Sequence, residues 1–223
     1  MGRGRAAGYD GQREMILARA AHLFARRGYS GTSMKEVAEA CGLSKAALYH
    51  YCRDKDSLLV SIAEAHVSRL QALVSEVAAQ PLAPPQRLRE LIRRILVEYA
   101  DAQDAHRVLT EDVKFMQPVD RERVLAQERE VVAGVAQAVG DLRPDLREAA
   151  LGKPLTMLLF GMINWLFTWM RPGGALDHAA IAPLVTDLFL GGLAAVQAPP
   201  GLGVDQGEIT AAPSPQRRAV RSR

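Results

Sequence analysis

The segment SKAALYH, residues 44–50, combines side chains that can bind phosphate with side chains small enough to approach a base. Lys45, Tyr49 and His50 can face outward from a helix, and two alanines follow Lys45. Ammonium, phenol and imidazole groups bind phosphate oxygens, while small side chains let a helix approach base edges in the major groove. This segment therefore has the residue types that contact with DNA requires.

The sequence contains no comparable pattern of residues for catalysis or metal binding. The histidines are scattered and show no metal-ligand spacing: His22, His50, His66, His106 and His178. The chain has no serine nucleophile elbow, and the glycines near its start do not have the spacing of a nucleotide-binding loop. We therefore expect no catalytic residue, no metal site and no cofactor.

The segment that precedes residues 44–50 predicts a second helix and a sharp turn. Ser33 with Glu36 three residues later forms the capping-box signature of a helix start, and residues 37–41 carry apolar side chains at helical spacing. Gly42 supplies the positive φ that a tight turn needs, and Ser44 is placed to cap the next helix. The pattern is typical of a helix-turn-helix.

These residues carry a family resemblance. The segment TSMKEVAEACGLSKAALYHYCRDKDSLL, which begins at Thr32, resembles the DNA-binding domain of TetR-type transcriptional repressors. The resemblance implies an all-α fold, with an N-terminal three-helix helix-turn-helix domain and a C-terminal helical ligand-binding and dimerisation domain. Cys52 departs from the family pattern, which commonly has Phe there, so local packing should differ.

The same resemblance assigns DNA contacts to nine positions. Ser33 and Lys35 would lie at the start of the first motif helix; Lys45, Ala46 and Ala47 would face bases; and Tyr49, His50, Tyr51 and Lys55 would lie near the DNA backbone. Lys55 would offer its ammonium to phosphate at the start of a long helix.

Charge and composition divide the 223-residue chain. Residues 1–55 carry ten Lys or Arg against five Asp or Glu, although the whole chain has a net charge of only +3. Positive charge is therefore gathered on the predicted DNA-binding part. We expect four regions: a flexible basic arm (1–11), a helix-turn-helix domain (12–55), a helical ligand-binding and dimerisation domain (56–198) and a disordered basic tail (199–223). The arm either enters the adjacent minor groove or is a solvated tail.

Helical periodicity predicts the elements of the second domain. The expected helices cover 55–79, 86–103, 104–116, 118–140, 146–170 and 180–197, with a possible kink at Pro154 and a cap at Asp177. The last two are so apolar that part of their surface should meet the same surface of a second chain, as the TetR-type resemblance also implies.

The segment NWLFTWMRPGGALDHAAIAPLVTDLFLGGL, which begins at Asn164, is also similar to a branch of the same family. That branch controls fatty-acid, phenylacetate or steroid breakdown and commonly responds to acyl-CoA thioesters. A pocket for an acyl chain would be bounded by Met157, Phe160, Gly161, Asn164 and Trp165, although side chains of these types at helical spacing also form ordinary cores. The charged residues of 121–130 either pair on the surface or form a mouth for an anionic ligand.

Two cysteines, Cys41 and Cys52, without a Cys-x-x-Cys motif suggest a reducing compartment. The most apolar run, 155–169, would be about 22 Å long as a helix, which is short for a membrane span. We therefore expect a cytoplasmic protein that does not enter a membrane.

The expected function is that of a ligand-responsive transcriptional regulator, and specifically a repressor. It would bind a palindromic operator in double-stranded DNA as a homodimer, and a small-molecule effector such as an acyl-CoA would release it. Two alternatives stay open: a redox-responsive regulator that uses Cys41 or Cys52, and a helical acyl-CoA-binding enzyme.

Overall fold

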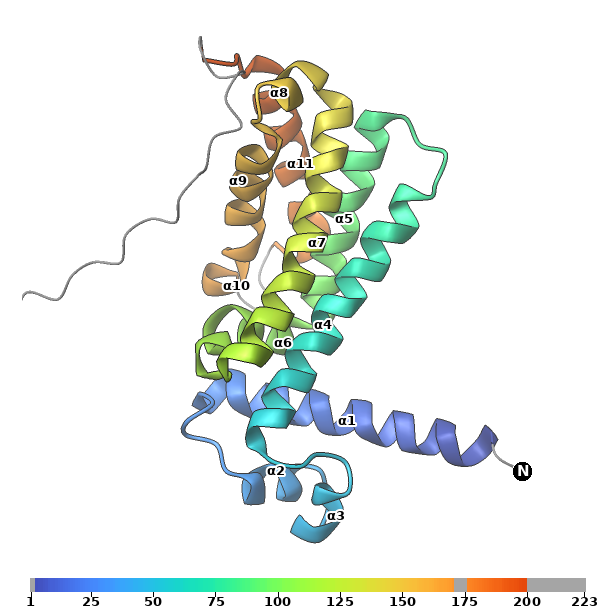
Figure 1. The fold of residues 1–223 in the computed structure, drawn as a ribbon, viewed down its shortest axis with the longest axis vertical. Helices are drawn as coiled ribbons and strands as arrows, with labels where there is room; N and C mark the ends of the chain where they lie inside the picture. Colours follow the sequence, from blue (N-terminus) through green and yellow to red (C-terminus); the bar gives the residue numbers. More distant parts are fainter. Residues whose placement is uncertain (1–2, 171–175, 200–223) are drawn as a thin grey trace, which may run out of the picture.

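The computed structural model describes residues 3–170 and 176–199, and every regular element in these ranges is a helix, as predicted. Figure 1 shows an upright bundle that stands on a smaller helical unit at its foot. The expected tail, residues 199–223, lies almost entirely outside the described residues.

The unit at the foot contains α1 (Arg3–Arg27), α2 (Met34–Ala40) and α3 (Lys45–Tyr49). Helix α1 is longer than the sequence pattern predicted, because it begins within the segment expected to be a flexible arm. Tyr9 gives this extension a tertiary contact, since its ring stacks on that of Tyr51 with centroids 4.9 Å apart. An interaction so distant in sequence was invisible to local pattern reasoning.

Helix α4 (Lys55–Ala78) rises from the foot into the bundle and belongs to both units. Its first turn is capped by Asp54, whose Oδ1 accepts a hydrogen bond from the Ser57 amide at 2.6 Å. Apolar side chains are buried from Leu58 to Val77, so the helix is held by packing along most of its length.

The rest of the bundle follows in chain order. Its elements are α5 (Pro84–Asp101), α6 (Gln103–Asp112), the 3₁₀ turn η1 (Val113–Phe115), α7 (Pro118–Leu142), α8 (Pro144–Glu148), α9 (Gly152–Asn164), α10 (Leu166–Trp169) and α11 (His178–Ala195). Helix α5 lies where a helix was predicted and buries an apolar stripe from Leu88 to Tyr99.

One expected helix, 146–170, is in fact three short helices. Ala150 adopts a φ of 58°, a left-handed conformation that ends one helix and turns the chain before the next. Pro154 therefore lies in the first turn of α9, where the missing N–H costs no helical bond, and it does not kink a continuous helix. The cap predicted at Asp177 is present, because the Ala180 amide donates to Asp177 Oδ1 at 2.8 Å.

Helices α4 and α7 approach closely at Gly134. A Cβ atom added there would lie 2.4 Å from Cγ1 of Val74, which is far inside van der Waals contact. Val is stiff at χ1 in a helix, so that methyl group cannot easily move away. Gly134 therefore sets how closely α7 packs against the helix that joins the two units.

Replacing Gly134 with Ala should lower the melting temperature, although Ala is favoured over Gly in helices by about 1 kcal/mol. Overpacking against Val74 costs about 1–3 kcal/mol and should outweigh that gain. Gly11→Ala is the matched control, since nothing lies within 4 Å of its added Cβ. Thermal unfolding followed by circular dichroism measures the melting temperature of each variant. A melting temperature of Gly134→Ala above that of Gly11→Ala would contradict the packing argument.

Candidate nucleic-acid interface and effector pocket

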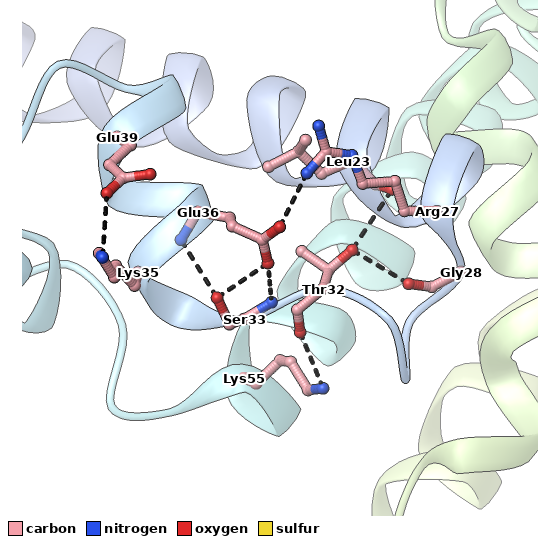
Figure 2. Close-up of polar contacts among 9 residues, drawn as sticks. All are labelled: Leu23, Arg27, Gly28, Thr32, Ser33, Lys35, Glu36, Glu39 and Lys55. Atoms are coloured by element: carbon pink, nitrogen blue, oxygen red, sulfur yellow. Dashed lines mark hydrogen bonds and ion pairs between the residues drawn. The ribbon is translucent and has the colours of Figure 1, made fainter.

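Two helix caps shape the predicted helix-turn-helix. The Ser33 amide donates to Glu36 Oε2 at 2.8 Å, and the Glu36 amide donates to Ser33 Oγ at 3.3 Å, which forms the predicted capping box (Figure 2). Gly42 has a φ of 65°, as the turn requires. The Ala47 amide then donates to Ser44 Oγ at 3.1 Å, so α3 begins where the sequence indicated.

Helix α3 has one buried side chain and a polar outer face. Leu48 is fully buried and anchors the helix. Lys45, Ala46, Tyr49 and His50 are exposed, while Ala47 is half-buried. Four of the predicted contact positions thus lie on one short, anchored helix and the fifth, His50, caps its end, in an arrangement that fits insertion into a groove.

Ser33 and Lys35 are also exposed, but Ser33 already has a structural role in the capping box. Arg27 lies 2.8 Å from Glu36 and ties the end of α1 to the same cap. The Ser33 amide, the Ser33 hydroxyl and then Arg27 hold the pKa of the Glu36 carboxyl below its usual range. The sequence pattern revealed the cap but not its link to Arg27.

Lys55 does not point freely into solvent as its assigned phosphate contact required. Its ammonium donates to the carbonyl oxygens of Tyr29 and Thr32, at 3.0 Å each, and lies 4.4 Å from the centre of the Tyr29 ring (Figure 2 shows the Thr32 bond). These contacts clamp the start of α4 to the loop between α1 and α2. Two of the three N–H donors of the ammonium are therefore used within the protein. A phosphate contact through the third N–H stays a prediction.

Tyr51 is half-buried against Tyr9 and so supports α3 from the side. Cys52 is half-buried, and its thiol lies 3.5 Å from the Leu48 carbonyl oxygen. Burial raises the pKa of both Cys41 and Cys52, which keeps them as thiols and lowers their reactivity. These environments do not favour the redox alternative.

A second cluster joins the foot to the bundle, and sequence reasoning missed it. The Tyr29 ring stacks on Phe115 with centroids 5.4 Å apart, and its hydroxyl donates to Asp56. His22 of α1 lies 2.9 Å from Asp104 of α6. These contacts connect residues up to 86 positions apart in the printed sequence, so no local pattern indicates them.

A pocket of about 720 Å³ lies within the bundle, between helices α4 to α9. Met157, Phe160 and Asn164, three of the five residues predicted for the acyl site, line it, and their contact with an acyl chain stays a prediction. Gly161 and Trp165 do not belong to its lining; Gly161 is exposed on α9, and Trp165 is exposed directly after the end of that helix. Positions 157, 160 and 164 share one helical face and positions 161 and 165 the next, so the original set mixed two faces.

Polar side chains gather at the end of the pocket next to α6. The Tyr99 hydroxyl donates to Asn164 Oδ1 at 2.8 Å, and the Tyr99 ring stacks on His106 at a centroid distance of 3.7 Å. Burial lowers the pKa of His106 to about 3, so the imidazole is neutral at physiological pH. Tyr99 and His106 come from α5 and α6 and were not predicted as site residues.

The outer faces of α9 and α11 expose a group of large apolar side chains. Leu188 is 69% exposed and Trp165 64%, and Leu158 and Leu184 are also exposed. Among the described residues, α11 is the one helix long and apolar enough to cross a membrane by length and composition. A single helix of this kind is weak evidence for a span, since a helix at a protein interface can have the same composition.

Comparisons with known proteins match both units. Residues 16–62 match bacterial regulatory proteins of the tetR family, and residues 81–193 match the tetracyclin repressor-like C-terminal domain. A TetR-family transcriptional regulator from Bordetella parapertussis is 36% identical, with a TM-score of 0.75 over 80% of this chain and 93% of that one. The transcriptional repressor KstR2 of Rhodococcus jostii is 26% identical, covering 84% of this chain and 94% of its own.

A further solved structure, AibR, was determined in complex with isovaleryl coenzyme A and operator DNA. It is 25% identical to this chain, with a TM-score of 0.69 over 79% of this chain and 97% of AibR.

Replacing Lys45 with Ala should weaken binding to specific duplex DNA more than binding to random duplex DNA, since this side chain is expected to face bases in the major groove. The melting temperature should stay unchanged because the side chain is exposed. Fluorescence anisotropy measures both affinities. Arg93→Ala, which removes an exposed cation from α5, is the control; an equal effect of both variants would contradict the assigned interface.

Replacing Lys55 with Met should instead lower stability by about 2 kcal/mol, because two charge-assisted hydrogen bonds are lost while the apolar stem is kept. Chemical denaturation measures the change. An unaltered unfolding midpoint would show that the two carbonyl contacts contribute nothing to the clamp.

Proposed function

The chain belongs to the TetR family of bacterial regulatory proteins and is a DNA-binding transcriptional regulator; we propose that it is a repressor whose operator is released when a CoA thioester fills the pocket. One observation carries the proposal. Helix α4 begins at the clamp beside the DNA-binding helices and, further along, lines the pocket with Val67 and Leu70. A ligand that moves α4 therefore moves the DNA-binding unit with it.

The pocket supports the ligand class. Its lining is mostly apolar, from Leu109 and Val131 to Met157 and Phe160, which suits an acyl chain. Arg147 and Lys153 line the end next to α8, where they can attract the phosphates of coenzyme A. AibR, a relative with the same fold, was solved with a CoA thioester and with DNA.

Helix length converts a small tilt into a useful displacement. The part of α4 between Lys55 and the pocket-lining Leu70 spans about 22 Å, so a rotation about the pocket shifts the start of the helix by several ångströms. In the dimer, the α3 helix of each protomer is the recognition helix, and the two must fit successive major grooves. A shift of this size therefore weakens operator binding. The ligand releases DNA because it binds better to the spacing that does not fit the operator.

The exposed apolar faces of α9 and α11 supply the dimer interface. Leu158, Trp165, Leu184 and Leu188 would pair with the same residues of a second copy in an isologous four-helix arrangement. A palindromic operator then follows from the two-fold axis of the dimer.

We assign the pocket a sensing role without catalysis, and we place the protein in the cytoplasm. The Tyr99 hydroxyl is engaged with Asn164, and His106 is stacked, buried and neutral, so these groups hold a ligand better than they transform one. A transcriptional regulator acts where the chromosome is, which supports the assigned compartment.

The dimer interface is tested by Leu188→Arg, which places a charge at its centre. The variant should sediment as a monomer at micromolar concentration and lose at least about tenfold in operator affinity, since each half-site then binds alone. Analytical ultracentrifugation and anisotropy measure the two effects. The control is Val119→Arg, which places the same charge at an exposed residue of α7. A dimeric Leu188→Arg protein would exclude this face.

The ligand response is tested with isovaleryl, phenylacetyl and long-chain acyl-CoA, with free coenzyme A as the control. At least one thioester should lower affinity for the upstream DNA of the protein's own gene by about tenfold or more, within the usual range of allosteric coupling. Ala133→Trp, which fills the pocket, should bind DNA normally and lose this response. If no thioester changes DNA binding, the ligand class is wrong while the DNA-binding function stands.

A further inference from the structure

The pocket has different polar groups at its two ends. Next to α8 it is lined by Gln137, Arg147 and Lys153, and next to α6 by Tyr99, His106, Glu128 and Asn164. Residues 128 and 137 are nine positions apart on α7, and 153 and 164 are eleven apart on α9. Along either helix the two ends are therefore about 14–16 Å apart.

The end next to α8 attracts anions. Lys153 is exposed and forms no ion pair with any side chain in residues 3–170 or 176–199. Arg147 is 51% exposed, and its one ion pair with a residue that the structure describes is with Asp141, at 3.5 Å, which leaves most of its guanidinium available. The two cations lie on different helices and face the same space.

The opposite end holds one acidic group, Glu128. It is half-buried, and within the described ranges it makes no ion pair and no hydrogen bond. Desolvation alone raises the pKa of its carboxyl, because no cation offsets the burial. The neighbouring Tyr99 hydroxyl cannot donate to it, since that proton is used in the bond to Asn164.

A ligand that fills the pocket removes water from the polar groups that line it, and a polar group then left without a partner costs the free energy of its lost hydration. The other polar groups at this end have partners inside the bundle: Tyr99 bonds to Asn164, and His106 stacks on Tyr99. Glu128 instead faces the cavity, where a ligand can supply the missing donor.

We propose that the effector is bipolar, with an anionic group held by Arg147 and Lys153, an apolar middle, and a hydroxyl group that donates to Glu128. Glu128 is then the residue that determines specificity, selecting hydroxylated acyl groups over plain aliphatic ones. This inference rests on the proposed function in that it uses the same pocket. It adds a chemical requirement that the acyl-CoA class alone does not contain.

Two probes with one difference test the requirement: laurate and ω-hydroxylaurate, below their critical micelle concentrations. Both carry a carboxylate that can stand in for the anionic group, and only the second carries a hydroxyl at the far end of an extended chain. Isothermal titration calorimetry on the full-length protein should show at least about tenfold tighter binding of the hydroxylated probe, because the plain chain leaves Glu128 buried without a partner.

Four variants, one of them a control, locate the effect. Glu128→Leu should remove the preference, because laurate then binds more tightly and ω-hydroxylaurate more weakly. Glu128→Gln, which keeps the shape of the side chain, should reduce the preference for ω-hydroxylaurate. Lys153→Ala should weaken both probes equally. Glu130→Gln, an exposed change on the same helix outside the pocket lining, should leave the preference intact.

Equal binding of the two probes, tighter binding of laurate, or no binding of either would overturn the proposal. A preference that survives in both Glu128 variants would also overturn it, since the hydroxyl would then be bound elsewhere. These outcomes are independent of the thioester experiment, which reads DNA release and tests the proposed function.

Discussion

The continuity of α4 is the constraint on which the rest of the structure depends. Its backbone hydrogen bonds fix Lys55 and Leu70 about 22 Å apart, so the clamp at one end and the pocket wall at the other cannot move independently. The close approach at Gly134 holds α7, which also lines the pocket, against the same helix. Occupancy of the pocket thus acts directly on the element that carries the DNA-binding unit.

The contacts at the two ends of α4 differ in strength and suit different roles. At the foot, the Lys55 ammonium, the Tyr29 ring and the Phe115 ring form a compact polar and aromatic joint. Such a joint transmits rotation as a rigid body, since its bonds have fixed directions. In the bundle, the side chains of α4 that line the pocket, Val67 and Leu70, are apolar, while Arg69 and Gln71 of the same helix donate hydrogen bonds to Glu98 of α5 and Glu130 of α7. A ligand that shifts α4 therefore also acts on these polar contacts.

The sequence predicted the features that depend on local patterns. The capping box at Ser33, the positive φ at Gly42 and the buried stripe of α5 follow from residue types at fixed spacing, and all are present. The features it missed depend on contacts between distant segments. The extension of α1 depends on Tyr9 meeting Tyr51, and the inward turn of Lys55 on two carbonyls more than twenty residues away.

The pocket shows the same limit. Met157, Phe160 and Asn164 share a helical face that can be read from their spacing, and all three line the pocket. Glu128, Tyr99 and His106 lie on three other helices, and nothing local shows that they converge. Spacing does not show which face of a helix turns toward the pocket, because packing sets that direction. Gly161 and Trp165 were therefore assigned to the pocket although they face away from it.

The central claim is that ligand binding changes the separation of the two recognition helices through α4. Pulsed electron–electron double resonance between spin labels at Glu39→Cys on α2 of both protomers, with Cys41→Ser and Cys52→Ser, measures the separation of the two DNA-binding units that carry the α3 helices. Adding the thioester that releases DNA should shift the distance distribution by several ångströms, and Ala133→Trp should abolish the shift. An unchanged distribution in a protein that still releases its operator would contradict the account.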